Sequence, residues 1–218
     1  FCGFPKTQDF FEEKKAIFSG NLINLDAKKV EKKNLRSNEL DIKIMGGSLG
    51  ARLINKTVPE VFSKLSEDFP EFKFILSHQC GKGNLEETKS YYDSLKTNFD
   101  LKLFEFVENM ENFYSNTDLV ISRAGALSVS EICETQNIAI FIPLKNSIDN
   151  HQYENAKFLV ENKSAFICEE DFMEENLKKI LFELVKNPEI LENMKKNISK
   201  VSLTDKKNII LKNILSNE

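Results

Sequence analysis

Short apolar segments alternate with helix-like segments along most of this chain, and this alternation constrains its fold more than any other feature. Continuous apolar runs such as residues 138–142 (IAIFI) are typical of strands that are buried on both faces of a sheet. Strands that alternate with helices at this spacing favour a parallel sheet. The sequence therefore predicts an α/β fold with a Rossmann-like, doubly wound parallel sheet.

The expected elements follow from the same pattern. Strands are predicted over residues 40–45, 72–77, 101–106, 118–122, 138–142 and 165–168. Helices are predicted over about 51–66, 85–95, 128–135 and 151–161, with a mostly helical C-terminal part. Pro59 should interrupt the first helix, because proline lacks an amide hydrogen. The charged stretch 28–38 is interpreted as a solvated linker.

Composition excludes several function classes. The chain has 34 acidic and 30 basic residues and a net charge of −4, which argues against a broad nucleic-acid interface. Four scattered cysteines and two histidines do not form a zinc motif, and no cofactor is expected. No apolar run approaches the ~20 residues that span a bilayer. Because the chain starts at Phe1 without an initiator Met, we expect it to be part of a longer protein.

Two glycine-rich segments follow predicted strands. In doubly wound sheets, ligands bind beyond the carboxyl ends of the strands. Residues 46–51 (GGSLGA) lack the pattern of a phosphate-binding P-loop, and a tight turn without a ligand explains them equally well. Residues 78–83 (HQCGKG) fit a flexible turn, and His78 has no obvious nucleophile partner in the sequence.

The segment 122–131 (SRAGALSVSE) has two interpretations that the sequence leaves open. Ser128 and Glu131 have the spacing of a capping box, in which both side chains bind helix amides. Alternatively, amides near Gly125 face a diphosphate, and the Glu131 carboxylate accepts hydrogen bonds from two vicinal sugar hydroxyls. Residues 149–153 pose a similar choice, because Asp149 either caps a helix or precedes a turn that binds a polar ligand.

Five motifs in this order resemble the MurG family, the bacterial N-acetylglucosaminyltransferases of peptidoglycan synthesis. They are GGSLGARLIN, HQCGKG, EFVENM, RAGALSVSE and DNHQYENA. Residues 19–21 (SGN) also resemble a family segment that precedes the second domain. The similarity runs over essentially the whole chain. It implies a two-domain glycosyltransferase of the GT-B type, of which this chain is the C-terminal, donor-binding half.

The resemblance also implies roles for individual residues. Ser48 would contact the nucleotide sugar, Val107 would hold uracil through its backbone, and Glu131 would bind the ribose. Gln152 would bind hydroxyls of N-acetylglucosamine. The diphosphate would lie against Ala126, Leu127, Ser128, Val129 and Ser130, and Asn24, Gly47 and His151 are further candidates. Asn24 stands where the family usually has arginine, and Leu49 replaces a residue that is commonly Gln or Arg.

The implied reaction is an inverting, metal-independent transfer of N-acetylglucosamine from UDP-N-acetylglucosamine to lipid I, which gives lipid II. Residues 1–38 would be the tail of an N-terminal domain and a linker, 39–203 the donor-binding domain, and 204–218 a helix that crosses back. The catalytic base, the acceptor pocket and the membrane-facing patch would lie in the N-terminal domain, so this chain alone should not complete catalysis.

The implied location is cytoplasmic, peripheral on the inner face of the bacterial plasma membrane. Two other functions stay open from the sequence. The chain could be the donor subunit of another UDP-sugar glycolipid glycosyltransferase, or a UDP-sugar binding module without catalysis.

Overall fold

The computed structural model describes residues 1–12, 15–47, 49–95, 99–147, 150–201 and 206–215. Its strands are β1 (Glu39–Met45), β2 (Lys73–Gln79), β3 (Phe99–Phe104), β4 (Leu119–Ser122), β5 (Ala139–Phe141) and β6 (Ala165–Ile167). Its α-helices are α1 (Arg52–Asp68), α2 (Leu85–Asp93), α3 (Met110–Tyr114), α4 (Ala126–Glu134), α5 (His151–Glu161), α6 (Met173–Lys186), α7 (Pro188–Ile198) and α8 (Lys206–Leu215). Two short 3₁₀-helices, Pro5–Phe10 and Ala27–Lys29, precede the sheet.

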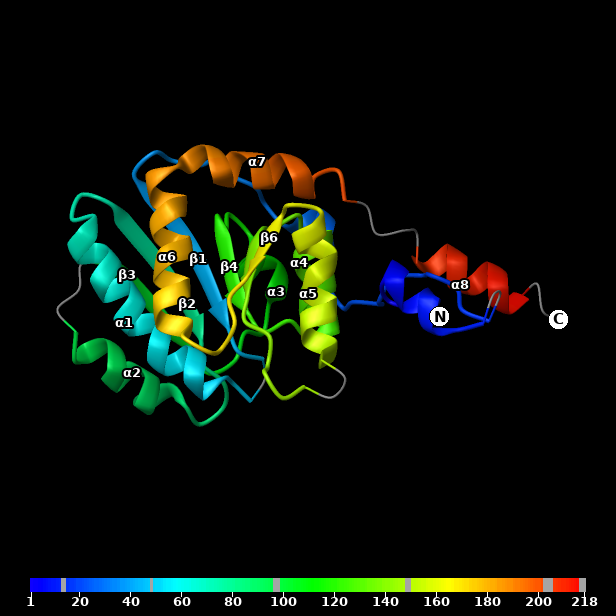
Figure 1. Ribbon diagram of the computed structural model, residues 1–218, viewed down its shortest axis with the longest axis horizontal. Coiled ribbons are helices and arrows are strands. Elements are labelled where there is room, and N and C mark those ends of the chain that lie inside the picture. The colour runs from blue at the N-terminus through cyan, green and yellow to red at the C-terminus, as the bar shows by residue number, and fades with distance from the viewer. Residues whose placement is uncertain (13–14, 48, 96–98, 148–149, 202–205, 216–218) are drawn as a thin grey trace.

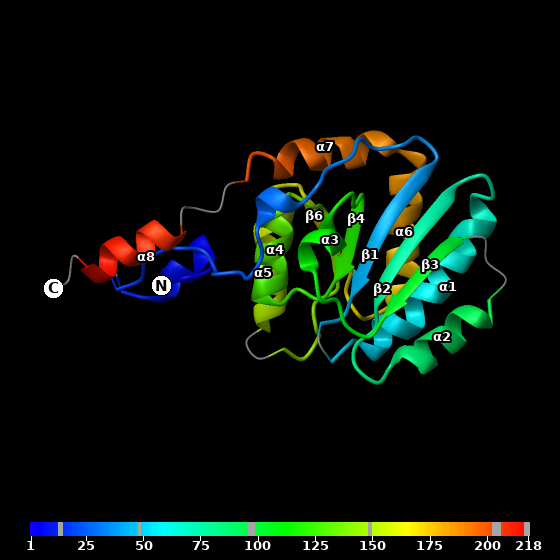
Figure 2. The same ribbon diagram turned by 180° about the vertical axis from the view of Figure 1, so that it is seen from behind.

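The strands form one parallel sheet in the order β3-β2-β1-β4-β5-β6 (Figures 1 and 2). The chain builds outward from β1 to β3 on one side and then returns to the centre to continue through β4. The predicted doubly wound, Rossmann-like sheet is therefore confirmed. The strands end at the edge that is lowest in Figure 1, where β1 and β4 are neighbours.

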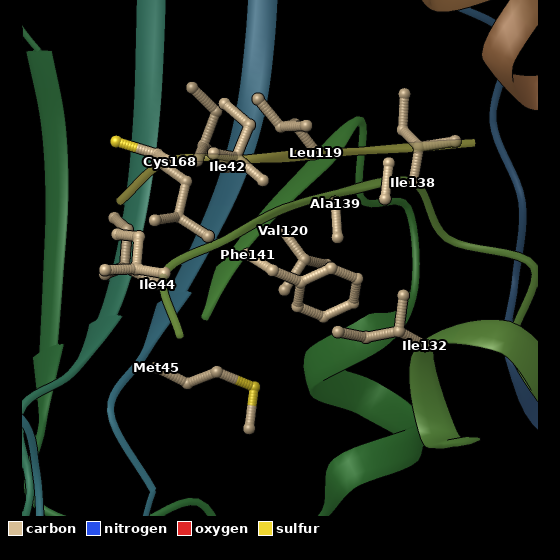
Figure 3. Packing of buried hydrophobic residues seen from close by; sticks show 14 of the residues in the cluster. Ile42, Ile44, Met45, Leu119, Val120, Ile132, Ile138, Ala139, Phe141 and Cys168 are labelled. Atoms are coloured by element: carbon tan, nitrogen blue, oxygen red, sulfur yellow. The ribbon is translucent and has the colours of Figure 1, made fainter. Parts of the chain in front are cut away.

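The core lies where the central strands meet the helices. Alternate residues of β1, such as Ile42 and Ile44, are fully buried. Figure 3 shows Val120 of β4 and Phe141 of β5 beside Ile132 of α4. Helices α1 and α6 pack together on the β1–β3 half of the sheet, while α4 and α5 pack together beside the β4–β6 half (Figure 1). The apolar runs in the sequence are thus covered, as a parallel sheet requires.

Two local predictions are wrong. Helix α1 continues through Pro59, which removes one intrahelical hydrogen bond. Buried neighbours such as Val58 and Phe62 hold the helix on the sheet and offset that loss. The structure also contains α3, for which no helix was predicted, because its five residues are too few for a helical period to stand out.

The charged stretch 28–38 is not a solvated linker. Val30 is buried in the core, and the amide of Asn116 donates to the carbonyl of Glu31 at 2.8 Å. Lys33 Nζ lies 3.1 Å from the buried carboxylate of Asp118. The stretch therefore packs against the domain through Val30 and Lys33, although most of its residues remain exposed.

Residues 1–12 and 15–20 lie at the side of the molecule beyond α5, where α8 also lies (Figures 1 and 2). Phe4 stacks on Phe158 of α5 with ring centroids 5.7 Å apart, and Asn21 Nδ2 donates to Ser130 Oγ at 2.9 Å. Apolar side chains of α8, including Leu211 and Leu215, are exposed. Among the described residues, no helix has the length and apolar character needed to cross a membrane.

Candidate functional site

A cleft of about 410 Å³ opens at the edge where the parallel strands end. It lies near the junction of β1 and β4, the switch point at which open α/β sheets bind their ligands. Five of the residues predicted or considered for the site line it: Gly47, Val107, Leu127, Ser128 and Glu131. The fold thus brings together segments that are up to 84 positions apart, from Gly47 to Glu131.

The other half of the cleft lining was not predicted. It consists of Met45, Gln79, Phe106, Met110 and Phe113. Gln79 belongs to the HQCGKG segment, so that motif was the available signal. Phe106 and Met110 belong to the EFVENM segment, which was a second available signal. Phe113 lies on α3, and without this helix nothing in the sequence places it at the site.

Part of the cleft lining forms an apolar wall. Val107 follows β3 and is half-buried, and its neighbour Phe106 is largely exposed. Met110 and Phe113 complete this wall. Such a surface suits a flat, uncharged ring, because aromatic and thioether side chains make favourable dispersion contacts with ring faces.

Another part of the lining is the start of helix α4, from which Leu127 and Ser128 line the cleft. Its N-cap residue, Gly125, provides no side-chain hydrogen bond. The amides of the first helical turn, Ala126, Leu127 and Ser128, have no carbonyl partner within the helix, and the helix dipole favours an anion at this point. Ser128 is the third helical residue rather than the N-cap, so the capping-box interpretation of Ser128 and Glu131 is wrong.

Glu131 provides the only carboxylate among the described residues that line the cleft. It is half-buried, and its Oε2 accepts a hydrogen bond from Tyr114 Oη at 3.1 Å. Burial raises the pKa of Glu131 above its ordinary value, and the Tyr114 hydrogen bond opposes that rise. A carboxylate of this kind accepts hydrogen bonds from hydroxyl groups, since its ionised oxygens are acceptors only.

The side chain of Gln79, at the end of β2, links the loops that follow β1, β2 and β3. It is 5 % exposed, and its Nε2 donates to the carbonyls of Gly47 and Glu105, both at 3.0 Å. Glu105 Oε1 in turn accepts from the amide of Gly83 at 2.9 Å. The loops after β1, β2 and β3 are therefore held in one arrangement around the cleft.

The glycines of the first two loops allow close backbone contact. A Cβ atom at Gly50 would lie 2.0 Å from the carbonyl oxygen of Cys80, and one at Gly81 would lie 2.2 Å from the amide nitrogen of Gly50. Both residues also have positive φ angles, +75° and +87°. These two glycines are thus needed for packing between the loops.

Several expected residues lie away from the cleft. Val129 and Ser130 are buried, the Val129 amide donates to the Gly125 carbonyl at 3.0 Å, and Ser130 Oγ accepts from Asn21. Val129 and Ser130 therefore do not face a ligand in the cleft. Asn24 is exposed and lines no part of the cleft. Ser48 and Asp149 lie outside the described residues.

The start of α5 lies beside the loop between β4 and α4, because Asn155 Nδ2 donates to the Ala124 carbonyl at 3.1 Å. Gln152 is half-buried, and its Oε1 accepts from the amide of Leu144 at 3.0 Å, while His151 is exposed. Neither residue lines the cleft itself. Gln152 is engaged in holding the loop that follows β5.

His78 is a core residue rather than a catalytic one. It is fully buried between Tyr92 Oη at 3.0 Å and Asn55 Oδ1 at 3.1 Å. Burial lowers its pKa to about 3, so the ring is neutral. Among the described residues, no group of three or more His, Cys, Asp or Glu side chains could hold a metal ion.

Comparisons with known proteins agree with this geometry. A curated relative from Rickettsia bellii, named UDP-N-acetylglucosamine--N-acetylmuramyl-(pentapeptide) pyrophosphoryl-undecaprenol N-acetylglucosamine transferase, is 40 % identical over 84 % of this chain. A relative with the same name from a Wolbachia of Drosophila simulans is 35 % identical over 92 % of the chain. The chain covers 51 % and 57 % of these two proteins, and thus spans about half of their length.

Solved structures match as well. The crystal structure of MurG from Acinetobacter baumannii superposes with a TM-score of 0.74 and 32 % identity over 84 % of this chain and 51 % of that protein. A UDP-N-acetylglucosamine 2-epimerase from Neisseria meningitidis, solved with UDP-N-acetylglucosamine bound, matches in fold only, with a TM-score of 0.53 and 17 % identity over 83 % of this chain and 45 % of that one. The profile of the glycosyltransferase family 28 C-terminal domain matches residues 42–210. The match covers the residues of the cleft and nearly all of the sheet, and the chain therefore belongs to the family of the glycosyltransferase family 28 C-terminal domain.

Proposed function

We propose that this chain is the UDP-sugar-binding half of an inverting N-acetylglucosaminyltransferase that converts lipid I to lipid II. The main support is the juxtaposition, in one cleft, of the Glu131 carboxylate, the first amides of α4 and an apolar wall. The names of the relatives include the sugar, the nucleotide and the acceptor.

In this proposal each part of the cleft binds one part of the donor. The uracil ring lies against Val107 and Phe106, whose wall is apolar. The ribose hydroxyls donate to Glu131, and the diphosphate faces the amides of Ala126 to Ser128. When the bond between the sugar and UDP breaks, negative charge grows on the β-phosphate. Fixed amides that already point at this charge stabilise the transition state without reorganisation.

The other half of the relatives' length would supply the acceptor site and the catalytic base. We infer that the exposed apolar residues of α8, together with residues 1–12 and 15–20, contact that half. The lipid acceptor and the inner face of the plasma membrane would be reached through it as well. These assignments keep the boundaries expected from the sequence, with the donor-binding domain at 39–203.

Calorimetric titration with UDP tests the donor site. Glu131→Ala should weaken UDP binding by about 1.5–3 kcal/mol, the range for a hydrogen bond to a charged group. Glu192→Ala is the matched control, because Glu192 is an exposed helical glutamate on α7, outside the cleft. If a folded Glu131→Ala variant binds UDP as tightly as the wild type, the cleft is not the UDP-binding site.

The sugar is tested separately. The chain should bind UDP-N-acetylglucosamine more tightly than UDP-glucose. Equal affinity for the two would favour another UDP-sugar glycolipid transferase, or a binding module without catalysis, over the N-acetylglucosaminyltransferase.

A further inference from the structure

The side chain of Tyr114 is buried next to the cleft, and its hydroxyl group needs a hydrogen-bond partner. Tyr114 is the last residue of α3 and has no exposed surface. Its hydroxyl lies 3.1 Å from Glu131 Oε2 and 3.4 Å from Met45 Sδ. Its carbonyl accepts from Asn137 Nδ2 at 3.2 Å. The side chain is therefore fixed by core packing at one end and by the Glu131 carboxylate at the other.

Burying a tyrosine hydroxyl is unfavourable unless it forms a hydrogen bond. A thioether is a weak acceptor, so the carboxylate is the effective partner of this hydroxyl. Burial also raises the pKa of Tyr114 well above its ordinary value, and the phenol stays protonated and keeps its hydrogen to donate.

The contact with Tyr114 also determines what Glu131 can offer a ligand. Tyr114 donates to Oε2 at 3.1 Å, and this is the hydrogen bond that the described residues make to the Glu131 carboxylate. Since the two oxygens belong to one planar group, fixing Oε2 from below orients Oε1. The Tyr114 hydrogen bond also lowers the pKa of Glu131, against the effect of burial, and so favours the ionised form.

We propose that Tyr114 is a positioning residue, which holds the Glu131 carboxylate in the orientation that binds the ribose diol without touching the ligand itself. The inference rests on the proposed UDP-sugar site. Tyr114 would thus affect ligand binding although it lies wholly inside the core.

The test compares the affinities of UDP and 2′-deoxy-UDP, since the second nucleotide lacks one of the hydroxyls assigned to Glu131. The wild-type chain should prefer UDP by about tenfold or more, in line with one hydrogen bond to a charged group. Tyr114→Phe removes one oxygen atom, and it should reduce this preference to less than about threefold. Its affinity for 2′-deoxy-UDP should fall by less than its affinity for UDP, because this nucleotide keeps only one of the two hydroxyls assigned to Glu131.

Tyr92→Phe is the matched control. Tyr92 is also buried, but its hydroxyl binds His78 and does not reach the cleft, so the preference for UDP should persist in this variant. If Tyr114→Phe keeps the wild-type preference, or weakens both nucleotides equally, the positioning role is overturned.

A second variant keeps the inference testable if Tyr114→Phe does not fold. Glu131→Gln leaves Tyr114 in the core and replaces the charged acceptor with a neutral amide, so the preference for UDP should again fall. Retention of the preference in Glu131→Gln would show that Glu131 does not bind the ribose, and would overturn that part of the proposed function together with the inference. A wild-type chain that binds neither nucleotide would instead refute the proposed function, and thus the two failures are distinguishable.

Discussion

The close contact between the first two glycine-rich loops leads to a prediction about Gly50. Gly50 has a φ of +75°, and an added Cβ would lie 2.0 Å from the carbonyl oxygen of Cys80. Gly50→Ala should therefore introduce both a strained backbone conformation and a clash with backbone atoms. Gly83 is a matched control, because its φ is +77° but nothing lies within 4 Å of an added Cβ.

The magnitudes follow from these two differences. The left-handed conformation costs an alanine about 1–2 kcal/mol, and this cost applies to both variants. An overpacked contact adds about 1–3 kcal/mol, and this applies to Gly50→Ala only. Gly83→Ala should thus lower the free energy of unfolding by about 1–2 kcal/mol, and Gly50→Ala by about 2–5 kcal/mol. For a chain of this size, each kcal/mol corresponds to about 2–4 °C in melting temperature.

Urea denaturation of the wild type and the two variants measures the difference directly. The slope of unfolding free energy against urea concentration should be the same for all three, because each exposes the same surface on unfolding. Equal destabilisation of Gly50→Ala and Gly83→Ala would refute the argument, since it would mean that the two loops do not touch as the structure places them.

Two further predictions concern buried polar groups near the same loops. The pKa of His78 is lowered to about 3 by burial, so the unfolded chain takes up a proton that the folded chain excludes. Unfolding free energy should fall by about 2 kcal/mol between pH 7 and pH 5, and His78→Gln should lack this component in urea titrations at both pH values. Gln79→Leu leaves two carbonyls without their donor, and should lower stability by about 1–3 kcal/mol and weaken UDP binding. Wild-type UDP affinity in a folded Gln79→Leu variant would contradict its role in arranging the loops.

The strands of this protein could be predicted from sequence because burial on both faces leaves uninterrupted apolar runs. Residues 138–142 are an example, where strand β5 was found at Ala139–Phe141. Helix ends were less certain, because capping was ambiguous. The motif RAGALSVSE could not reveal whether Ser128 caps the helix, and only the position of Gly125 as the N-cap answered this question.

Part of the cleft lining coincides with residues named from the sequence, and their role in binding a UDP-sugar stays a prediction. Gly47, Val107, Leu127, Ser128 and Glu131 share the cleft as the resemblance implied. Val129 and Ser130 belong to the same motif but face the core, since successive residues of a helix point in different directions. Their burial depends on which side of α4 meets the sheet, and the motif alone does not contain that information.

What the sequence by itself determined is therefore the alternation of strands and helices, the parallel sheet and the loops that form the cleft. These depend on local apolar runs and on glycine, whose effects act over a few residues. The tertiary structure alone decided the contacts between distant segments, such as Tyr114 beneath Glu131, Gln79 between two loops, and Lys33 beside Asp118. Such contacts join residues that are far apart in the chain, and a hydrogen bond between them leaves no periodic trace in the sequence.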